Sequence, residues 1–165
     1  MLKCTMLTLG IDPGTATTGF GLLHEQDDKL VYLDHGVILT SKTESPQARL
    51  RLIYLELKRL ITKHKPDAIA VEKLFFGVNS KTAIAVGQAR GMSLLAAAEM
   101  RVPVAEYTPL QVKMAVTGYG KADKLQVQQM IKTLLALKEI PKPDDAADAL
   151  AVALCHLNSY KLMSL

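Results

Sequence analysis

Residues 7–21, which read LTLGIDPGTATTGFG, constrain the fold of this chain more than any other segment. An apolar run at 7–11 ends at the carboxylate of Asp12. The Pro-Gly pair that follows favours a tight turn, because proline fixes one φ angle and glycine frees the next. Residues 17–24 are apolar enough to return as a largely buried strand. The segment predicts a hairpin with a carboxylate at the rim of a sheet, which suits a metal or phosphate site but also an ordinary Asx turn.

The rest of the chain predicts further strands and then alternating helices and strands. We expect strands at 30–39, 68–71 and 102–106, and helices at 46–63, 80–100, 109–117, 122–137 and 144–160. A long helix between two strands of one sheet implies a right-handed crossover, which makes the fourth strand parallel to the first. The prediction is a single α/β domain over residues 1–165, in which helices flank a five-stranded mixed sheet of three antiparallel and then two parallel strands.

A second carboxylate stands at the end of a second strand. Glu72 follows the apolar run at 68–71 in the way that Asp12 follows the first strand. If these two parallel strands are neighbours, both carboxylates lie at the same edge of the sheet, where open α/β sheets bind their ligands.

Two further acids are spaced to join them. Asp145 and Asp148 lie three residues apart at the start of the last helix, so they share one face. The neighbouring Asp144 has a simpler interpretation, because acids stabilise a helix N-terminus. Asp148 stands among alanines and leucine, so we expect it to be buried and to need a partner, either a basic side chain or a cation.

Together, these four carboxylates indicate a metal site. Oxygen ligands suit Mg²⁺, with Mn²⁺ able to substitute, and two ions per site would orient a water and stabilise the leaving oxygen in phosphodiester hydrolysis. Lys124 or Lys121, after a Gly-x-Gly turn, would neutralise the scissile phosphate, although a single lysine is also compatible with a solvated surface position.

The distribution of charge along the chain fits a protein that binds a polyanion. The net charge is only +4, but residues 49–90 carry nine Lys/Arg against three Asp/Glu, and residues 108–142 carry six against two. These tracts indicate nucleic-acid binding or, alternatively, solvated helix faces. The two cysteines and four histidines have no metal-like spacing, so we expect no zinc site and reduced thiols in a cytoplasmic protein. No apolar run predicts a membrane span or a signal peptide.

Five sequence blocks resemble the RuvC family of crossover-junction endodeoxyribonucleases, in family order and over nearly the whole chain. The blocks are Gly-Ile-Asp-Pro-Gly at 10–14 with Thr-Gly-Phe-Gly at 18–21, Val-Glu-Lys-Leu-Phe at 71–75 with Asn79, Gly-Gln-Ala-Arg-Gly at 87–91, Gln-Val-Lys at 111–113 with the segment 118–127, and Asp-Ala-Ala-Asp-Ala-Leu-Ala at 145–151 with His156.

The resemblance implies an RNase H-like fold and a homodimer that nicks two opposed strands of a Holliday junction. It places the family's acidic ligands on Asp12, Glu72, Asp145 and Asp148, its aromatic residue at the junction centre on Phe75, and its functional lysines on Lys113 and Lys124. It also implies a dimer contact through the helix that carries Gly87 and Gly91, and work with the RuvA and RuvB branch-migration proteins. Asp144 departs from the family pattern, so either it or Asp145 could approach the metal.

Two other function classes remain open at this level. An actin- or Hsp70-like nucleotide-binding module begins with a similar Gly-Ile-Asp strand end, but it needs a second copy of the motif and a much longer chain. A non-catalytic protein of the same fold would bind four-way junctions without cutting them. The complete acidic set argues against that reading, because a binder gains nothing from four carboxylates facing phosphates.

Overall fold

One mixed sheet forms the centre of the molecule. The computed structural model describes residues 5–27, 29–73 and 80–163. Its strands run in the order β3-β2-β1-β4-β5 and are β1 (Met6–Asp12), β2 (Thr17–Gln26), β3 (Lys29–Leu39), β4 (Ala68–Glu72) and β5 (Val104–Tyr107). The first three are antiparallel neighbours, and β4 and β5 run parallel to β1, so the predicted sheet is confirmed.

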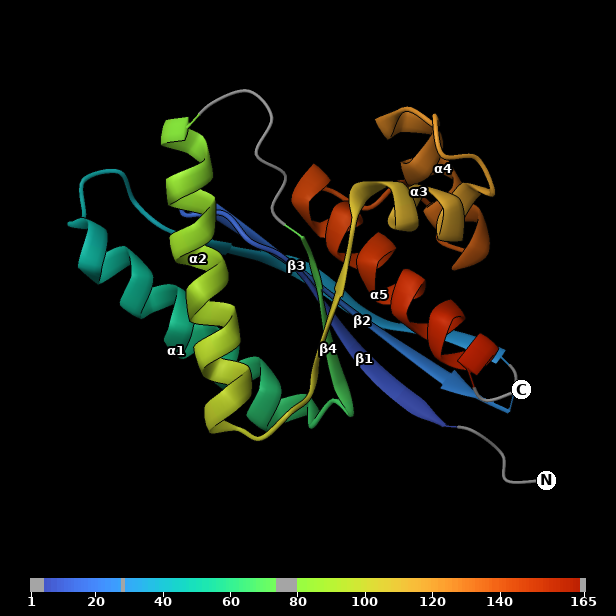
Figure 1. The fold of residues 1–165 in the computed structure, drawn as a ribbon, viewed down its shortest axis with the longest axis horizontal. Coiled ribbons are helices and arrows are strands. Elements are labelled where there is room, and N and C mark those ends of the chain that lie inside the picture. The colour runs from blue at the N-terminus through green and yellow to red at the C-terminus, as the bar shows by residue number, and fades with distance from the viewer. Residues whose placement is uncertain (1–4, 28, 74–79, 164–165) are drawn as a thin grey trace.

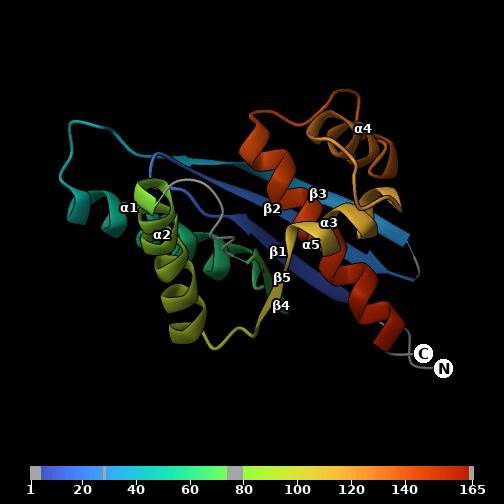
Figure 2. The same ribbon diagram turned by 45° about the horizontal axis from the view of Figure 1, so that its top comes forward.

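Helices cover both faces of this sheet (Figures 1 and 2). The helices are α1 (Pro46–His64), α2 (Ser80–Glu99), α3 (Pro109–Thr117), α4 (Lys124–Leu134) and α5 (Asp144–Met163). Helices α1 and α2 lie on one side, and α5 lies across the other side with α3 and α4 packed outside it. None of the helices in the described part of the chain has the length and apolar character that crossing a membrane requires.

Alternation along β1 divides the core into two layers. Leu9 and Ile11 are fully buried toward α1 and α2, while Gly10 between them faces α5. This is the period-2 pattern of a strand buried on both faces. The layer under α5 is unusually alanine-rich on the helix side, since Ala146, Ala149 and Ala153 are all fully buried.

Helix α4 is shorter than the predicted 122–137. Asp123 is its N-cap, and its carboxylate accepts a hydrogen bond from the Gln126 backbone N–H while the Gln126 side chain accepts one from the Asp123 N–H. This capping box starts the helix at Lys124. At the other end, Leu135 is the C-cap and Ala136 has a φ of 50°, which stops the helix before 137.

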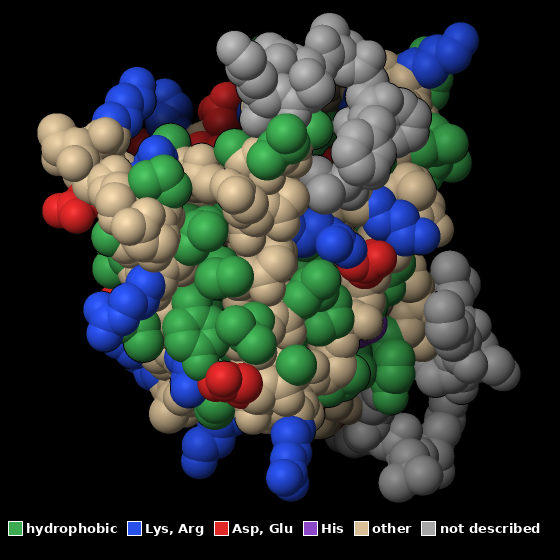
Figure 3. Space-filling view, turned by 60° about the vertical axis from the view of Figure 1, so that its left-hand side comes forward, with side chains coloured by type: hydrophobic (Ala, Val, Ile, Leu, Met, Phe, Trp, Pro, Cys, Tyr) green, Lys and Arg blue, Asp and Glu red, His purple; other side chains and the backbone are tan. Residues whose placement is uncertain are grey.

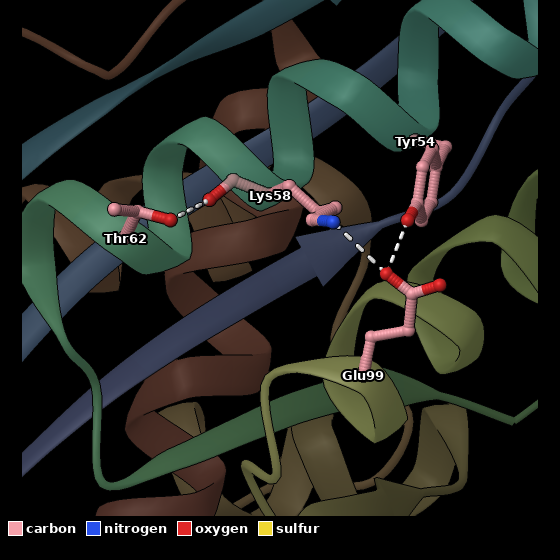
Figure 4. Close-up of polar contacts among 4 residues, drawn as sticks. All are labelled: Tyr54, Lys58, Thr62 and Glu99. Carbon is pink, nitrogen blue, oxygen red and sulfur yellow. Dashed lines mark hydrogen bonds and ion pairs between the residues drawn. The ribbon is translucent and has the colours of Figure 1, made fainter.

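Figure 3 views the side of the molecule formed by α1 and α2, where hydrophobic side chains gather in the centre of the face. The two helices are tied together at one end by Glu99, which accepts hydrogen bonds from the Tyr54 hydroxyl and, at 2.9 Å, from the Lys58 ammonium (Figure 4). This contact holds the C-terminal end of α2 against α1.

Candidate active site

Two carboxylates lie side by side in one row across the sheet. Ile11 of β1 pairs with Val71 of β4, so the next residues along, Asp12 and Glu72, end neighbouring parallel strands. Both project toward α5, on the face opposite to Ile11 and Val71. The predicted meeting of these two acids at one edge of the sheet is therefore what the register produces.

Helix α5 reaches this row because glycines leave room for it. A Cβ added at Gly19, which pairs with Asp12, would lie 2.0 Å from the Asp145 carbonyl oxygen. One added at Gly10 would lie 2.0 Å from the Ala149 carbonyl oxygen. The helix thus rests directly on strand backbone, and its first turns place Asp145 and Asp148 over the strand-end acids. The role of these glycines was missed from sequence, although glycines in strands facing an alanine-rich helix were the available signal.

Electrostatics show that the four acids share one environment. Burial, followed by the charges of Asp148, Asp145 and Glu72, raises the pKa of Asp12 from 3.8 to about 7. Burial is also the main cause that raises the pKa of Glu72 and of Asp148. Each of these three side chains is destabilised as an anion, so the cluster favours a bound cation.

Lys124 supplies one such cation from the first turn of α4. Its Nζ lies 3.1 Å from Asp148 Oδ2 and 3.4 Å from Asp144 Oδ2. Burial opposes its charge, but the hydrogen bond and ion pair with Asp148 and then with Asp144 raise the pKa of Lys124. A basic partner for Asp148 was one of the two predicted alternatives.

The acids of the α5 first turn differ in position. Asp144 is solvent-exposed, and the Gln128 amide and Lys124 lower its pKa. Asp145 is partly buried, and its charge acts on Asp12. The geometry therefore favours Asp145 over Asp144 as the partner of the strand-end acids.

The other predicted residues lie at different distances from this cluster. Lys113 on α3 is close enough to lower the pKa of Glu72, against the larger effect of burial. Lys121 is exposed in the turn before α4, and no ion pair to it is found within the described ranges. Phe75 lies outside the described residues.

The donor set fits a hard divalent cation. The four side chains offer carboxylate oxygens, which Mg²⁺ and Mn²⁺ prefer, and their mutual repulsion would be relieved by positive charge. Within the part of the chain that the structure describes, no three acid, histidine or cysteine side chains are already clustered tightly enough to hold an ion. Ion binding would therefore require the side chains to draw together.

Two polar pairs not anticipated from sequence, one buried and one partly buried, connect β5 to the helices on either face of the sheet. The Tyr107 hydroxyl and His156 Nδ1 lie 2.8 Å apart, which ties β5 to α5 beside Glu72. On the other face, Arg90 of α2 pairs with Glu106 of β5. Neither pair has a sequence signal beyond isolated polar residues in apolar segments.

Comparisons with known proteins agree along almost the whole chain. The family described as "Crossover junction endodeoxyribonuclease RuvC" matches residues 8–156. A protein of that name from Syntrophomonas wolfei is 55% identical over 159 residues, which cover 96% of this chain and 92% of the relative. Another from Halothermothrix orenii is 56% identical over 158 residues, or 95% of each chain.

A solved structure agrees as well. The Thermus thermophilus protein, described in complex with a Holliday junction substrate, superposes with a TM-score of 0.90 at 38% identity, covering 96% of this chain and 97% of that one. The sheet order and helix placement are thus those of an RNase H-like fold, as expected.

Proposed function

The chain belongs to the RuvC family of crossover junction endodeoxyribonucleases and is a Holliday junction resolvase, and from that premise we propose that its four clustered carboxylates form a metal-dependent cleavage site. The same premise removes the nucleotide-binding and non-catalytic alternatives. The proposal treats residues 1–165 as one nuclease domain working in the cytoplasm.

We assign the role of metal ligands to Asp12, Glu72, Asp145 and Asp148. Two Mg²⁺ ions, when bound there, would supply an activated water and stabilisation of the leaving oxygen. The protein fixes the positions of these ligands. Asp12 and Glu72 are held by the sheet, and Asp145 and Asp148 are held by the end of α5 that packs on the sheet. Rigid elements on both sides limit how far the ligands can move apart.

Lys124 and Lys113 have a separate role toward the DNA. Lys124 is bound to Asp148 at 3.1 Å without DNA, so a phosphate entering the site would compete for the same ammonium group. With Asp148 engaged by a cation, Lys124 would be able to pair with the scissile phosphate. The charge of Lys113 acts on Glu72, which supports a contact between this lysine and a DNA phosphate near the cluster.

The observation that carries the proposal is the raised pKa of Asp12. Its main cause is burial, and the next three causes are the three other acids assigned here as ligands. A protein without a cation at this site would gain nothing from such an arrangement, because isolated buried carboxylates are destabilising.

The direct test uses a 5′-labelled mobile four-way junction incubated with Mg²⁺ or with EDTA, beside a linear duplex of the same sequence. We expect paired nicks at symmetric positions, on the junction alone and with Mg²⁺ alone. Cleavage that persists undiminished in EDTA, after the protein has been stripped of metal, would contradict metal dependence.

We also propose that α2 forms the homodimer contact. Ile84, Gln88, Gly91 and Leu95 follow one another at helical spacing on the face opposite to buried Ala89, Ser93 and Ala96. Ile84 is 65% exposed and Leu95 45% exposed. A Cβ added at Gly91 would meet nothing within 4 Å, so this glycine does not serve packing on the sheet. An apolar stripe around a small residue suits close packing with the same stripe on a second copy.

Other expectations from the sequence stay predictions. We propose that Phe75 contacts the junction centre, that Lys121 contacts DNA, and that RuvA and RuvB act with this resolvase on the same junction. The exposed position of Lys121 supports its assignment.

A further inference from the structure

A pocket lies on the far side of α4 from the carboxylates. We define the α3–α4 corner as residues 117–122, which join the helix of Lys113 to the helix of Lys124. Beside it opens a pocket of about 410 Å³. We propose that this pocket receives a base of the junction strand that passes through the cleavage site. The inference rests on the proposed position of that site.

The lining has the chemistry of a nucleobase site. Tyr119, Ala122 and Met130 supply apolar surface, and Thr117, Gln126 and Gln129 supply hydroxyl and amide groups at its edge. A base has flat apolar faces and a polar edge, so it needs both kinds of contact at once. The polar groups argue against an aliphatic ligand.

Tyr119 is an exposed aromatic ring on a fixed backbone. Its side chain is 55% exposed, yet its N–H donates to Thr117 Oγ1 at 3.1 Å and its carbonyl accepts from the Ala122 N–H at 3.1 Å. Gly118 adopts a φ of 71° at the start of the turn, and Gly120 packs so closely on α3 that an added Cβ would lie 2.5 Å from Leu110 Cδ1. Because the backbone that carries the ring is fixed, stacking on a base would order only the side chain.

The charge around the pocket favours DNA over a protein segment. Lys121 is exposed in the turn beside it, and Lys132 lies further along on α4. Between residues 108 and 138 the sole acid is Asp123, whose carboxylate is engaged in the α4 capping box. A surface that combines an aromatic ring with lysines and lacks free acids matches a strand of phosphates and bases.

The pocket is also within reach of a strand at the cleavage site. Lys124 faces the carboxylates from one side of α4, and Gln126 and Gln129 face the pocket from the other. A helix with its side chains is about 10–12 Å across. A DNA strand that runs from the scissile phosphate past Lys124 therefore reaches the pocket within a few nucleotides.

The test is an abasic scan of binding in EDTA, where no strand is cut. Each junction in the scan carries a single abasic nucleotide. The positions tested lie within about five nucleotides of the cleavage point, a range chosen from the width of a helix. For the wild type, one position should weaken binding by about fivefold or more. Tyr119→Ala should weaken binding to the intact junction by a similar factor and show no added loss at that one position, as expected for groups in contact.

Two variants act as controls. Tyr119→Phe keeps the ring and should bind like the wild type. Leu134→Ala truncates an exposed side chain on the same helix outside the pocket lining and should leave the scan unchanged. The inference is overturned if Tyr119→Ala binds the intact junction as tightly as the wild type does. It is also overturned if, at every abasic position, the loss of affinity from the substitution adds to the loss from the missing base. Because binding is read without cleavage, failure here is separate from failure of the metal-site assignment.

Discussion

Asp148 combines three properties that are costly for a carboxylate: burial, two neighbouring acids and a position inside an apolar helix segment. Its contact with Lys124 offsets part of this cost. We expect Asp148→Asn to reduce junction cleavage in Mg²⁺ by at least about two orders of magnitude, because it removes a metal ligand from the site. Binding of the junction in EDTA should stay within about twofold of the wild type, since one repulsive charge is lost.

The control for this variant is Glu56→Gln, which removes an exposed carboxylate paired with Arg59 on α1. It should cleave like the wild type. A second comparison separates the adjacent acids of α5: Asp145→Asn should lose far more cleavage than Asp144→Asn. Full cleavage by purified Asp148→Asn would show that the ligand assignment is wrong.

Asp12 should make the metal-free protein less stable at high pH. Its pKa is raised to about 7 in the folded protein, above the ordinary 3.8. Between these values the unfolded chain has released the proton and the folded chain has kept it, so the free energy of unfolding falls as pH rises through this window. Asp12→Asn removes this titration, so its free energy of unfolding should exceed that of the wild type by about 4 kcal/mol at pH 8 and match it below about pH 4.

Urea unfolding in EDTA over this pH range measures the difference. Mg²⁺ at pH 8 should stabilise the wild type more than Asp12→Asn, because the ion binds the folded state through this carboxylate. Parallel pH profiles for the two proteins would mean that Asp12 ionises normally and that the cluster is less coupled than the geometry implies.

At the scale of elements, the seating of α5 on β1 and β2 controls the site. A side chain at Gly19 would overlap the Asp145 carbonyl, which is backbone and cannot move aside without moving the helix. We expect Gly19→Ala to lower the free energy of unfolding by about 2 kcal/mol or more and to reduce cleavage strongly by displacing Asp145.

Gly36→Ala is a matched control one strand further out. Its added Cβ would approach only the Phe20 ring, at 2.9 Å, and a side-chain ring can shift. The control should lose clearly less stability and keep its cleavage rate, measured by the same denaturation and nicking assays. Equal losses of stability and cleavage for the two variants would indicate a general effect on the sheet rather than a specific effect on the packing of α5.

At the scale of the whole molecule, the exposed face of α2 should decide assembly. Leu95→Asp places a charge in the proposed apolar contact and should raise the dimer Kd by at least about tenfold. Analytical ultracentrifugation over a concentration series measures this. Nicks on the two opposed strands should then lose their pairing, because each monomer would act alone.

Leu39→Asp is the corresponding control, since Leu39 is 65% exposed at the end of β3 and does not belong to the proposed contact on α2. It should sediment like the wild type. Unchanged dimerisation of Leu95→Asp would move the interface to another surface.

Local patterns were sufficient to predict most of the architecture. The strands followed from the apolar runs, and the parallel direction of β4 followed from the handedness of the crossover. The Asp123 capping box, which starts α4 at Lys124 rather than at 122, was overlooked. The end of α4 was missed because its stop is a left-handed residue, Ala136, that no local signal marks. Family motifs also assigned the four acids to the proposed metal site by position alone.

What the sequence by itself determined is which carboxylates stand at element ends and which helices can carry them. Only the tertiary structure decided how those groups act on one another: that Lys124 pairs with Asp148, that Asp145 rather than Asp144 faces Asp12, and that Asp12 holds its proton up to a pKa of about 7. The physical reason is distance. Burial and Coulomb interactions depend on separations of a few ångströms between residues that are far apart in the chain, such as Asp12 and Asp145. Those separations exist only once glycine backbone lets α5 rest on the sheet.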